Sequence, residues 1–127
     1  MKKHNPVVWF EIYVTDLDRA TSFYEEVLQI KLNDMKDPSG GSMEMKLFPD
    51  NMENYGSGGA IVKMEGIEPS ANGSIVYFGC EDCKEPESRV EDNGGKIIQS
   101  KMSIGEHGFV FIVLDTEGNS IGFHSLK

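Results

Sequence analysis

The chain repeats one pattern of secondary structure, and this repeat limits its possible folds more than any single residue does. Residues 6–32 have the pattern of a strand, a helix and a strand, and residues 73–98 repeat that layout. Two more apolar strands follow in each half, at 43–48 and 58–64 and then at 109–114 and 119–124. One such module cannot cover its own sheet, so the repeat predicts two βαβββ modules that pack together around a core and a concavity.

The length of 127 residues fits one α+β domain rather than two. We expect module one over about residues 6–65, a linker over about 66–73 (GIEPSANG) and module two over about 74–127. All of residues 1–127 then form a single domain.

The charge of the chain excludes several classes of partner. Twelve basic and 21 acidic residues give a formal net charge of −9, which disfavours nucleic acid and anionic membranes. No apolar run approaches the ~18 residues of a membrane span, and the first residues lack the apolar stretch of a signal peptide. Two cysteines are too few to staple a secreted fold, so we expect a cytoplasmic protein.

Alternation along the strands assigns their faces. Asp16 is a good N-cap for a helix that ends at Leu28, and Gly94 and Gly95 end a second helix that Asp82 can cap. One strand face should be buried under these helices, and it comprises Val8, Phe10, Ile12, Val76, Phe78, Val110, Ile112 and Leu114. The opposite, cleft-side face should carry Trp9, Glu11, Tyr13 and Tyr77.

Four segments in order carry a resemblance that spans nearly the whole chain. They are VVWFEIYVTDLDRATSFYEEVL, the GGAIV strand, VEDNGGKII, and DTEGNSIGF near the C-terminus. Together they resemble the vicinal-oxygen-chelate superfamily, which contains glyoxalase I, extradiol dioxygenases, fosfomycin-resistance enzymes and bleomycin-resistance proteins. The resemblance implies paired βαβββ modules, a cleft formed by the curved sheets, and assembly as a homodimer.

The resemblance also implies four metal-ligand positions. They fall on Trp9, on Ala60 or Val62, on Ile75 and on Gly122. None of these side chains binds a metal, whereas a divalent ion needs about three converging donors. We therefore expect the usual metal site to be lost and no cofactor to be bound there. A divalent metal would require ligands shifted by two residues, to Glu11 and His124.

Glu11 and His124 are the candidate catalytic residues. Each lies two residues from a ligand position, so the strand period keeps both on the cleft side. A carboxylate and an imidazole there could act as an acid–base pair, bind a remnant metal, or hold a ligand. Alternatively, Glu11 bonds a neighbouring strand and His124 is merely exposed.

Four aromatic residues are candidate ligand contacts: Trp9, Tyr13, Tyr77 and Phe111. Aromatic walls with a few polar groups suit a small organic molecule, although the same rings could fill a cleft that binds nothing. The Cys80-x-x-Cys83 pair resembles a redox motif, but its intervening residues are acidic, and we expect structural cysteines.

The sequence therefore favours a glyoxalase/bleomycin-resistance-like protein that binds a small organic molecule between its modules. Three alternatives stay open. They are a metal-free lyase or isomerase that uses Glu11 and His124, a non-catalytic protein that sequesters a cationic drug, and a metal enzyme with shifted ligands. Whether the chain is an enzyme stays open as well.

Overall fold

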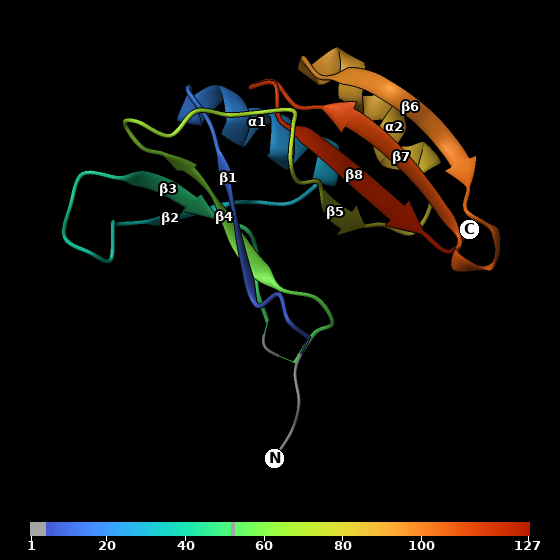
Figure 1. Ribbon diagram of the computed structural model, residues 1–127, viewed down its shortest axis with the longest axis horizontal. Helices are drawn as coiled ribbons and strands as arrows, with labels where there is room; N and C mark the ends of the chain where they lie inside the picture. Colours follow the sequence, from blue (N-terminus) through green and yellow to red (C-terminus); the bar gives the residue numbers. More distant parts are fainter. Residues whose placement is uncertain (1–4, 52) are drawn as a thin grey trace.

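The computed structural model describes residues 5–51 and 53–127. The first module consists of β1 (Trp9–Tyr13), α1 (Leu17–Leu28), β2 (Asn33–Met35), β3 (Glu44–Leu47) and β4 (Gly58–Lys63). Its four strands form one sheet in the order β1-β4-β3-β2, in which β1 and β4 are parallel and the other neighbours antiparallel (Figure 1).

The second module repeats this arrangement. It contains β5 (Val76–Gly79), α2 (Lys84–Val90), a 3₁₀ turn (Glu91–Asn93), β6 (Lys96–Ser103), a second 3₁₀ turn (Gly105–His107), β7 (Phe109–Leu114) and β8 (Ser120–Ser125). The sheet order is β5-β8-β7-β6, and β5 and β8 are parallel. The predicted α+β fold of paired βαβββ modules is confirmed.

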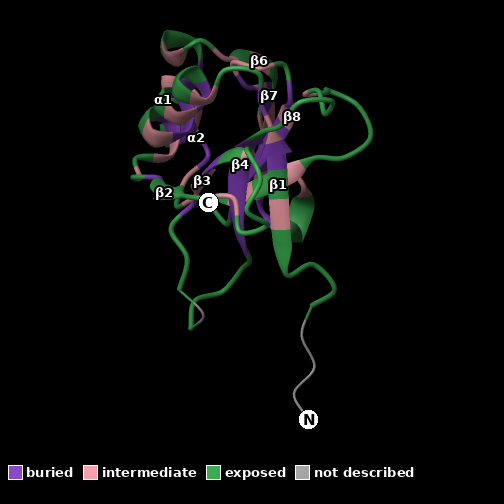
Figure 2. Cartoon of the chain, turned by 90° about the vertical axis from the view of Figure 1, so that its left-hand side faces the viewer, coloured by how far each residue is buried: buried purple, intermediate pink, exposed green. Residues whose placement is uncertain are grey.

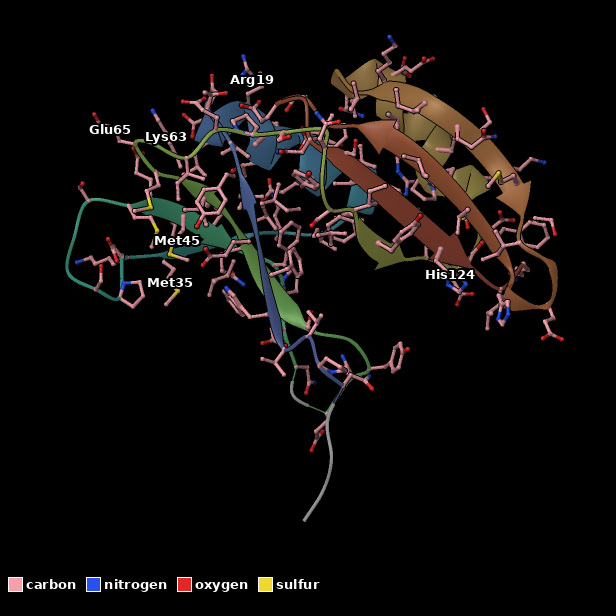
Figure 3. All side chains as sticks on the ribbon, in the orientation of Figure 1. Arg19, Met35, Met45, Lys63, Glu65 and His124 are labelled. Atoms are coloured by element: carbon pink, nitrogen blue, oxygen red, sulfur yellow. The ribbon has the colours of Figure 1, made fainter. Side chains whose placement is uncertain are left out.

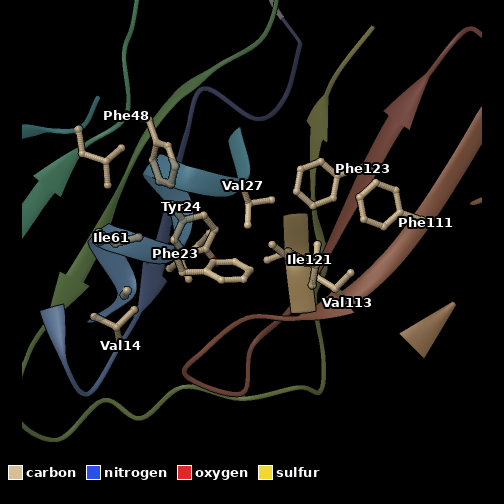
Figure 4. Close-up of a cluster of buried hydrophobic side chains, with 14 of the residues drawn as sticks. Val14, Phe23, Tyr24, Val27, Phe48, Ile61, Phe111, Val113, Ile121 and Phe123 are labelled. Atoms are coloured by element: carbon tan, nitrogen blue, oxygen red, sulfur yellow. The ribbon is translucent and has the colours of Figure 1, made fainter. Parts of the chain in front are cut away.

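The two sheets lie side by side, with β1 and β5 at their facing edges (Figure 1). The rings of Phe10 on β1 and Phe78 on β5 are 5.9 Å apart across this boundary. One cluster of buried side chains then continues through both modules and includes Tyr24, Ile61 and Phe123 (Figure 4). Burial is concentrated in the central strands, as Figure 2 shows for β4. The two modules therefore share the main core.

The first helix begins and ends as the sequence predicts. The Asp16 side chain accepts a hydrogen bond from the Arg19 backbone N–H at 3.0 Å, which caps the helix. Ala20, Phe23, Tyr24 and Val27 form its buried face. Gly94 has a φ of 92° after the second helix and its 3₁₀ turn, a conformation that favours glycine. In the described part of the chain, no helix is long and apolar enough to cross a bilayer.

The predicted core of β1 and β5 is only partly correct, since the residues face the helix side but only one of them is fully buried. Ile12 is buried, and Phe10, Val76 and Phe78 are half-buried against the core cluster. Val8 is 63% exposed, and it precedes β1, which begins at Trp9. Glu11 lies on the face away from α1, so the predicted phase of β1 is right.

The predicted phase of β7 is wrong. Phe111 and Val113 pack in the core, where the Phe111 ring stacks on Phe123 at a centroid distance of 4.5 Å. Val110, Ile112 and Leu114 lie on the opposite face instead of under the helices. The register explains this, because Ile112 pairs with Gly122 and directly paired residues share a face of the sheet. A strand that is apolar at every position, as FVFIVL is, gives no sign by itself of which face is buried.

Candidate functional site on the open face of the first sheet

The face of the first sheet away from α1 carries the row Trp9, Glu11 and Tyr13. These residues alternate along β1, so their side chains share one face. Behind them lies a small apolar cluster of Met45, Ala60 and Val62, which Tyr13 partly covers. Met35 pairs with Met45 across β2 and β3, and both lie beside each other in Figure 3. The open face thus has an apolar floor with a single carboxylate among aromatic side chains.

Two aromatic donors hold the Glu11 carboxylate. The Tyr13 hydroxyl donates to Oε1 at 2.6 Å, and the Trp9 indole Nε1–H donates to Oε2 at 3.2 Å. The hydrogen bond to Glu11, with burial and the carboxylate charge, raises the pKa of Tyr13 to about 12. Tyr13 therefore remains a hydrogen-bond donor at physiological pH. No ion pair involves Glu11 in the part of the chain that the structure describes.

A hollow of about 190 Å³ opens between Glu11 and the segment that joins the modules. We call it the inter-module hollow. Ile12, Val76 and Ile121 supply apolar lining, and no lysine or arginine among residues 5–51 and 53–127 lines it. Its polar lining comes from Glu11, Tyr13, Glu68, Ser70, Asn72, Ser74, Asn119 and Ser120.

Hydrogen bonds fix the walls of this hollow. The backbone N–H of Ser70 donates to Asn119 Oδ1 at 2.9 Å, and Asn119 Nδ2 donates to the Tyr13 carbonyl at 2.8 Å. The Ser120 hydroxyl donates to the Ala71 carbonyl at 2.8 Å. Asn119 thus joins β1, the connecting segment and β8. The sequence suggested only a linker and a turn here. The run of short polar residues in the linker was the signal that such a wall exists.

His124 does not meet Glu11 within one chain. It lies in β8 of the second sheet, where its Nε2 is 2.7 Å from the His107 carbonyl oxygen (Figure 3). A carbonyl only accepts, so Nε2 carries the proton and Nδ1 is the free acceptor in the neutral ring. Both oxygens of Glu11 are already bonded on β1. The structure brings Trp9, Glu11 and Tyr13 together and leaves His124 apart.

The other two predicted ligand contacts have different outcomes. Tyr77 lies on the open face of the second sheet and is 48% exposed. Phe111 is fully buried on the helix side, so its predicted place in the cleft is wrong for the reason given for β7.

The ligand positions that the fold family implies do not fit a metal. Trp9, Ala60, Val62, Ile75 and Gly122 offer no donor side chain. A Cβ atom built on Gly122 would lie 2.5 Å from the Tyr77 ring, so that ring fills the space a ligand side chain would need. Among residues 5–51 and 53–127, no three His, Cys, Asp or Glu side chains are grouped to hold an ion.

The two cysteines are free thiols with sulfur atoms 4.0 Å apart. Cys83 is fully buried, and its Sγ lies 3.5 Å from the Phe109 carbonyl oxygen. Burial and the neighbouring Cys83 raise the pKa of Cys80 to about 12, which opposes thiolate formation. These features favour the predicted structural role.

Comparison with known proteins places the chain in a family. Residues 7–123 match the Glyoxalase/Bleomycin resistance protein/Dioxygenase superfamily. A glyoxylase-like domain-containing protein of Didymella fabae is 30% identical over 121 residues, which is 94% of this chain and 93% of that protein.

Solved structures agree on the fold. A glyoxalase-related enzyme from Fulvimarina pelagi has a TM-score of 0.70 and 15% identity, and covers 96% of this chain and 88% of its own. Glyoxalase I from Zea mays has a TM-score of 0.74 and 22% identity over 95% of this chain, but only 46% of its own length. The chain therefore corresponds to about half of that enzyme. With these matches over nearly its whole length, the chain belongs to the Glyoxalase/Bleomycin resistance protein/Dioxygenase superfamily, also called the vicinal-oxygen-chelate superfamily.

Proposed function

We propose that this protein binds a small organic cation on the open face of its first sheet, with no metal in the family's usual position. The observation that carries the proposal is the Glu11 carboxylate, which Trp9 and Tyr13 hold and which has no basic partner among the residues that the structure describes. This function is of the sequestering type and does not require catalysis.

Three physical features support a cationic ligand. The Trp9 side chain is 42% exposed beside a fixed carboxylate, and an indole face attracts ammonium groups. The inter-module hollow next to Glu11 contains a second carboxylate, Glu68. The formal net charge of −9 adds long-range attraction for a cation.

A metal-free enzyme that uses Glu11 as base and His124 as its partner has less support. The two side chains lie in different sheets and bond other groups. If they are uncoupled, the ring nitrogen chemical shifts of His124 should be the same in wild type and in Glu11→Gln. A clear movement of these shifts would restore the acid–base hypothesis.

We also propose a homodimer. The open faces of both sheets leave further large apolar side chains exposed, namely Met35, Ile75, Tyr77, Ile98 and Met102. A second copy would cover part of this surface, since exposed apolar side chains that share a face are typical of interaction sites. Sedimentation equilibrium at micromolar concentration should give twice the mass of the chain, and a monomer would contradict the proposal.

Trp9 makes the ligand proposal easy to test, because it is the only tryptophan in the chain. Titration with tetramethylammonium should change its fluorescence, and added salt should weaken the binding. Glu11→Gln should weaken binding at least about tenfold, since a charged partner is lost. The control is Glu44→Gln, which removes a carboxylate from β3 of the same sheet without touching Trp9 or Tyr13. Equal affinity of Glu11→Gln and wild type would overturn the proposal.

A further inference from the structure

We infer that the inter-module hollow binds the hydroxylated part of the same ligand, so that the ligand class is a hydroxyl-bearing amine of about one sugar ring in size. This inference rests on the proposed cation site at Glu11. It adds a second recognition element on the segment that joins the modules. This element binds hydroxyl groups by hydrogen bonds, whereas the Glu11 site binds the positive charge.

The hollow offers hydrogen-bonding groups that the protein itself leaves unused. In the part of the chain that the structure describes, the Asn72 side-chain amide and the Ser74 hydroxyl make no hydrogen bond. Both line the hollow, together with Glu68 and Glu11. An amide supplies donors and an acceptor, and a hydroxyl supplies both, so together they match the mixed character of sugar hydroxyls.

The hollow is also apolar at its base. Ile12 and Ile121 are buried and line it, with the half-buried Val76 beside them. A polyol ring presents hydroxyls at its edge and C–H groups on its faces, so apolar residues below and polar residues around them suit it. An anionic ligand such as a phosphate is disfavoured, because among the described residues the hollow is lined by two carboxylates and no basic side chain.

The walls are ordered before a ligand arrives. Asn119 holds Ser70 and the Tyr13 carbonyl, and Ser120 holds Ala71. Asn72 is fixed next to them, because its backbone N–H donates to the Ser70 hydroxyl at 3.0 Å. A ligand therefore does not have to order this segment, which lowers the entropic cost of binding. The volume of about 190 Å³ limits the hydroxylated part to one small ring or chain.

Three probes separate the two recognition elements. Tetramethylammonium carries the charge alone, glucose carries the hydroxyls alone, and glucosamine carries both. Trp9 fluorescence measures binding at Glu11, and amide chemical shifts of Asn72 and Ser74 report on the hollow. We expect glucosamine to bind at least about tenfold more tightly than tetramethylammonium. It should change both the Trp9 fluorescence and the amide chemical shifts of Asn72 and Ser74.

Variants then locate the hydroxyl site. The double variant Asn72→Ala with Ser74→Ala should weaken glucosamine binding to the level of tetramethylammonium, and should leave tetramethylammonium unchanged. Ser100→Ala, on the exposed strand β6, is the matched control and should change neither.

The outcomes distinguish this inference from the proposed function. If tetramethylammonium binds at Glu11 but glucosamine binds no more tightly, or if the double variant has no effect on glucosamine, the hydroxyl site is wrong and the cation site stands. If glucosamine shifts the hollow residues but Glu11→Gln leaves its affinity unchanged, the hollow binds hydroxyls and the cation site is wrong. If neither tetramethylammonium nor glucosamine binds, both proposals are wrong.

Discussion

Arg19 of the first module and Glu117 of the second form an ion pair, with Nε of the guanidinium 2.7 Å from Oε2 of the carboxylate. The Glu117 side chain is completely buried, and its Oε1 also accepts hydrogen bonds from the backbone N–H groups of Thr15 and Asp16 at 3.0 and 2.9 Å. The turn between β7 and β8 thus satisfies the free donors that precede α1. A turn of one module thereby completes a helix of the other.

Glu117→Gln should destabilise the protein in a pH-dependent way. Burial alone would raise the pKa of Glu117, but the hydrogen bonds from Arg19, Asp16, Thr116 and Thr15 outweigh it and lower the pKa to about 2 from its ordinary 4.5. This stabilisation is fully present above about pH 5 and is lost as the pH falls through 4.5 toward 2. We expect a loss of about 2 kcal/mol near neutral pH, measured by urea unfolding.

Glu26→Gln is the control for that experiment, because Glu26 is an exposed carboxylate on α1, the helix that carries Arg19. It should change the free energy of unfolding little at any pH. A difference between Glu117→Gln and wild type that stays constant from pH 7 to about pH 2 would contradict the account.

Tyr24→Phe should lower stability by about 1–2 kcal/mol, the usual effect of losing a buried hydrogen bond. The Tyr24 hydroxyl donates to Asp115 Oδ2 in the core, and Asp115 also accepts from the backbone N–H groups of Glu117 and Asn119. Thermal unfolding measures the effect. Tyr55→Phe is the control, because Tyr55 is 99% exposed, and equal effects of the two changes would count against the role of Asp115.

Gly108→Ala should be more damaging than Gly56→Ala. Both glycines have a positive φ, 107° and 102°, so alanine is strained by the backbone conformation at each of them. A Cβ atom on Gly108 would lie 2.2 Å from the Ser125 carbonyl oxygen, whereas one on Gly56 would meet nothing within 4 Å. We expect a further loss of about 2 kcal/mol or more at Gly108, from steric strain. Equal melting temperatures would show that the loop moves aside.

Tyr13 should titrate late, and Glu11 should be the cause. NMR of protein with ¹³Cζ-labelled tyrosine should give a resonance for Tyr13, assigned with Tyr13→Phe, that titrates near pH 12. In Glu11→Gln the pKa should move down toward the ordinary value of 10.0, because the carboxylate charge and its hydrogen bond are lost. Since the folded pKa is raised, the interaction stabilises the fold below about pH 10 and is lost as the pH rises through 12. An unchanged titration would mean that the hydrogen bond does not form in solution.

The sequence determined the modules, the two helices and the face of β1. Period-two alternation from Trp9 to Tyr13 and the Asp16 cap are local signals, so they could be read without any tertiary contact. The same alternation placed Glu11 away from α1, and the donor-free residues at Trp9, Ile75 and Gly122 were visible directly.

Only the tertiary structure decided which face of β7 is buried in the core and which residues neighbour Glu11. Phe111 and Ile112 are equally apolar, so the β7–β8 register chose which of them entered the core. Glu11 and His124 shared a predicted side of their strands, but the lateral placement of the two sheets separates them and puts Asn119, Ser70 and Asn72 beside Glu11 instead. Local periodicity fixes the face on which a side chain lies, whereas the neighbour it meets depends on how distant segments pack, which no local pattern specifies.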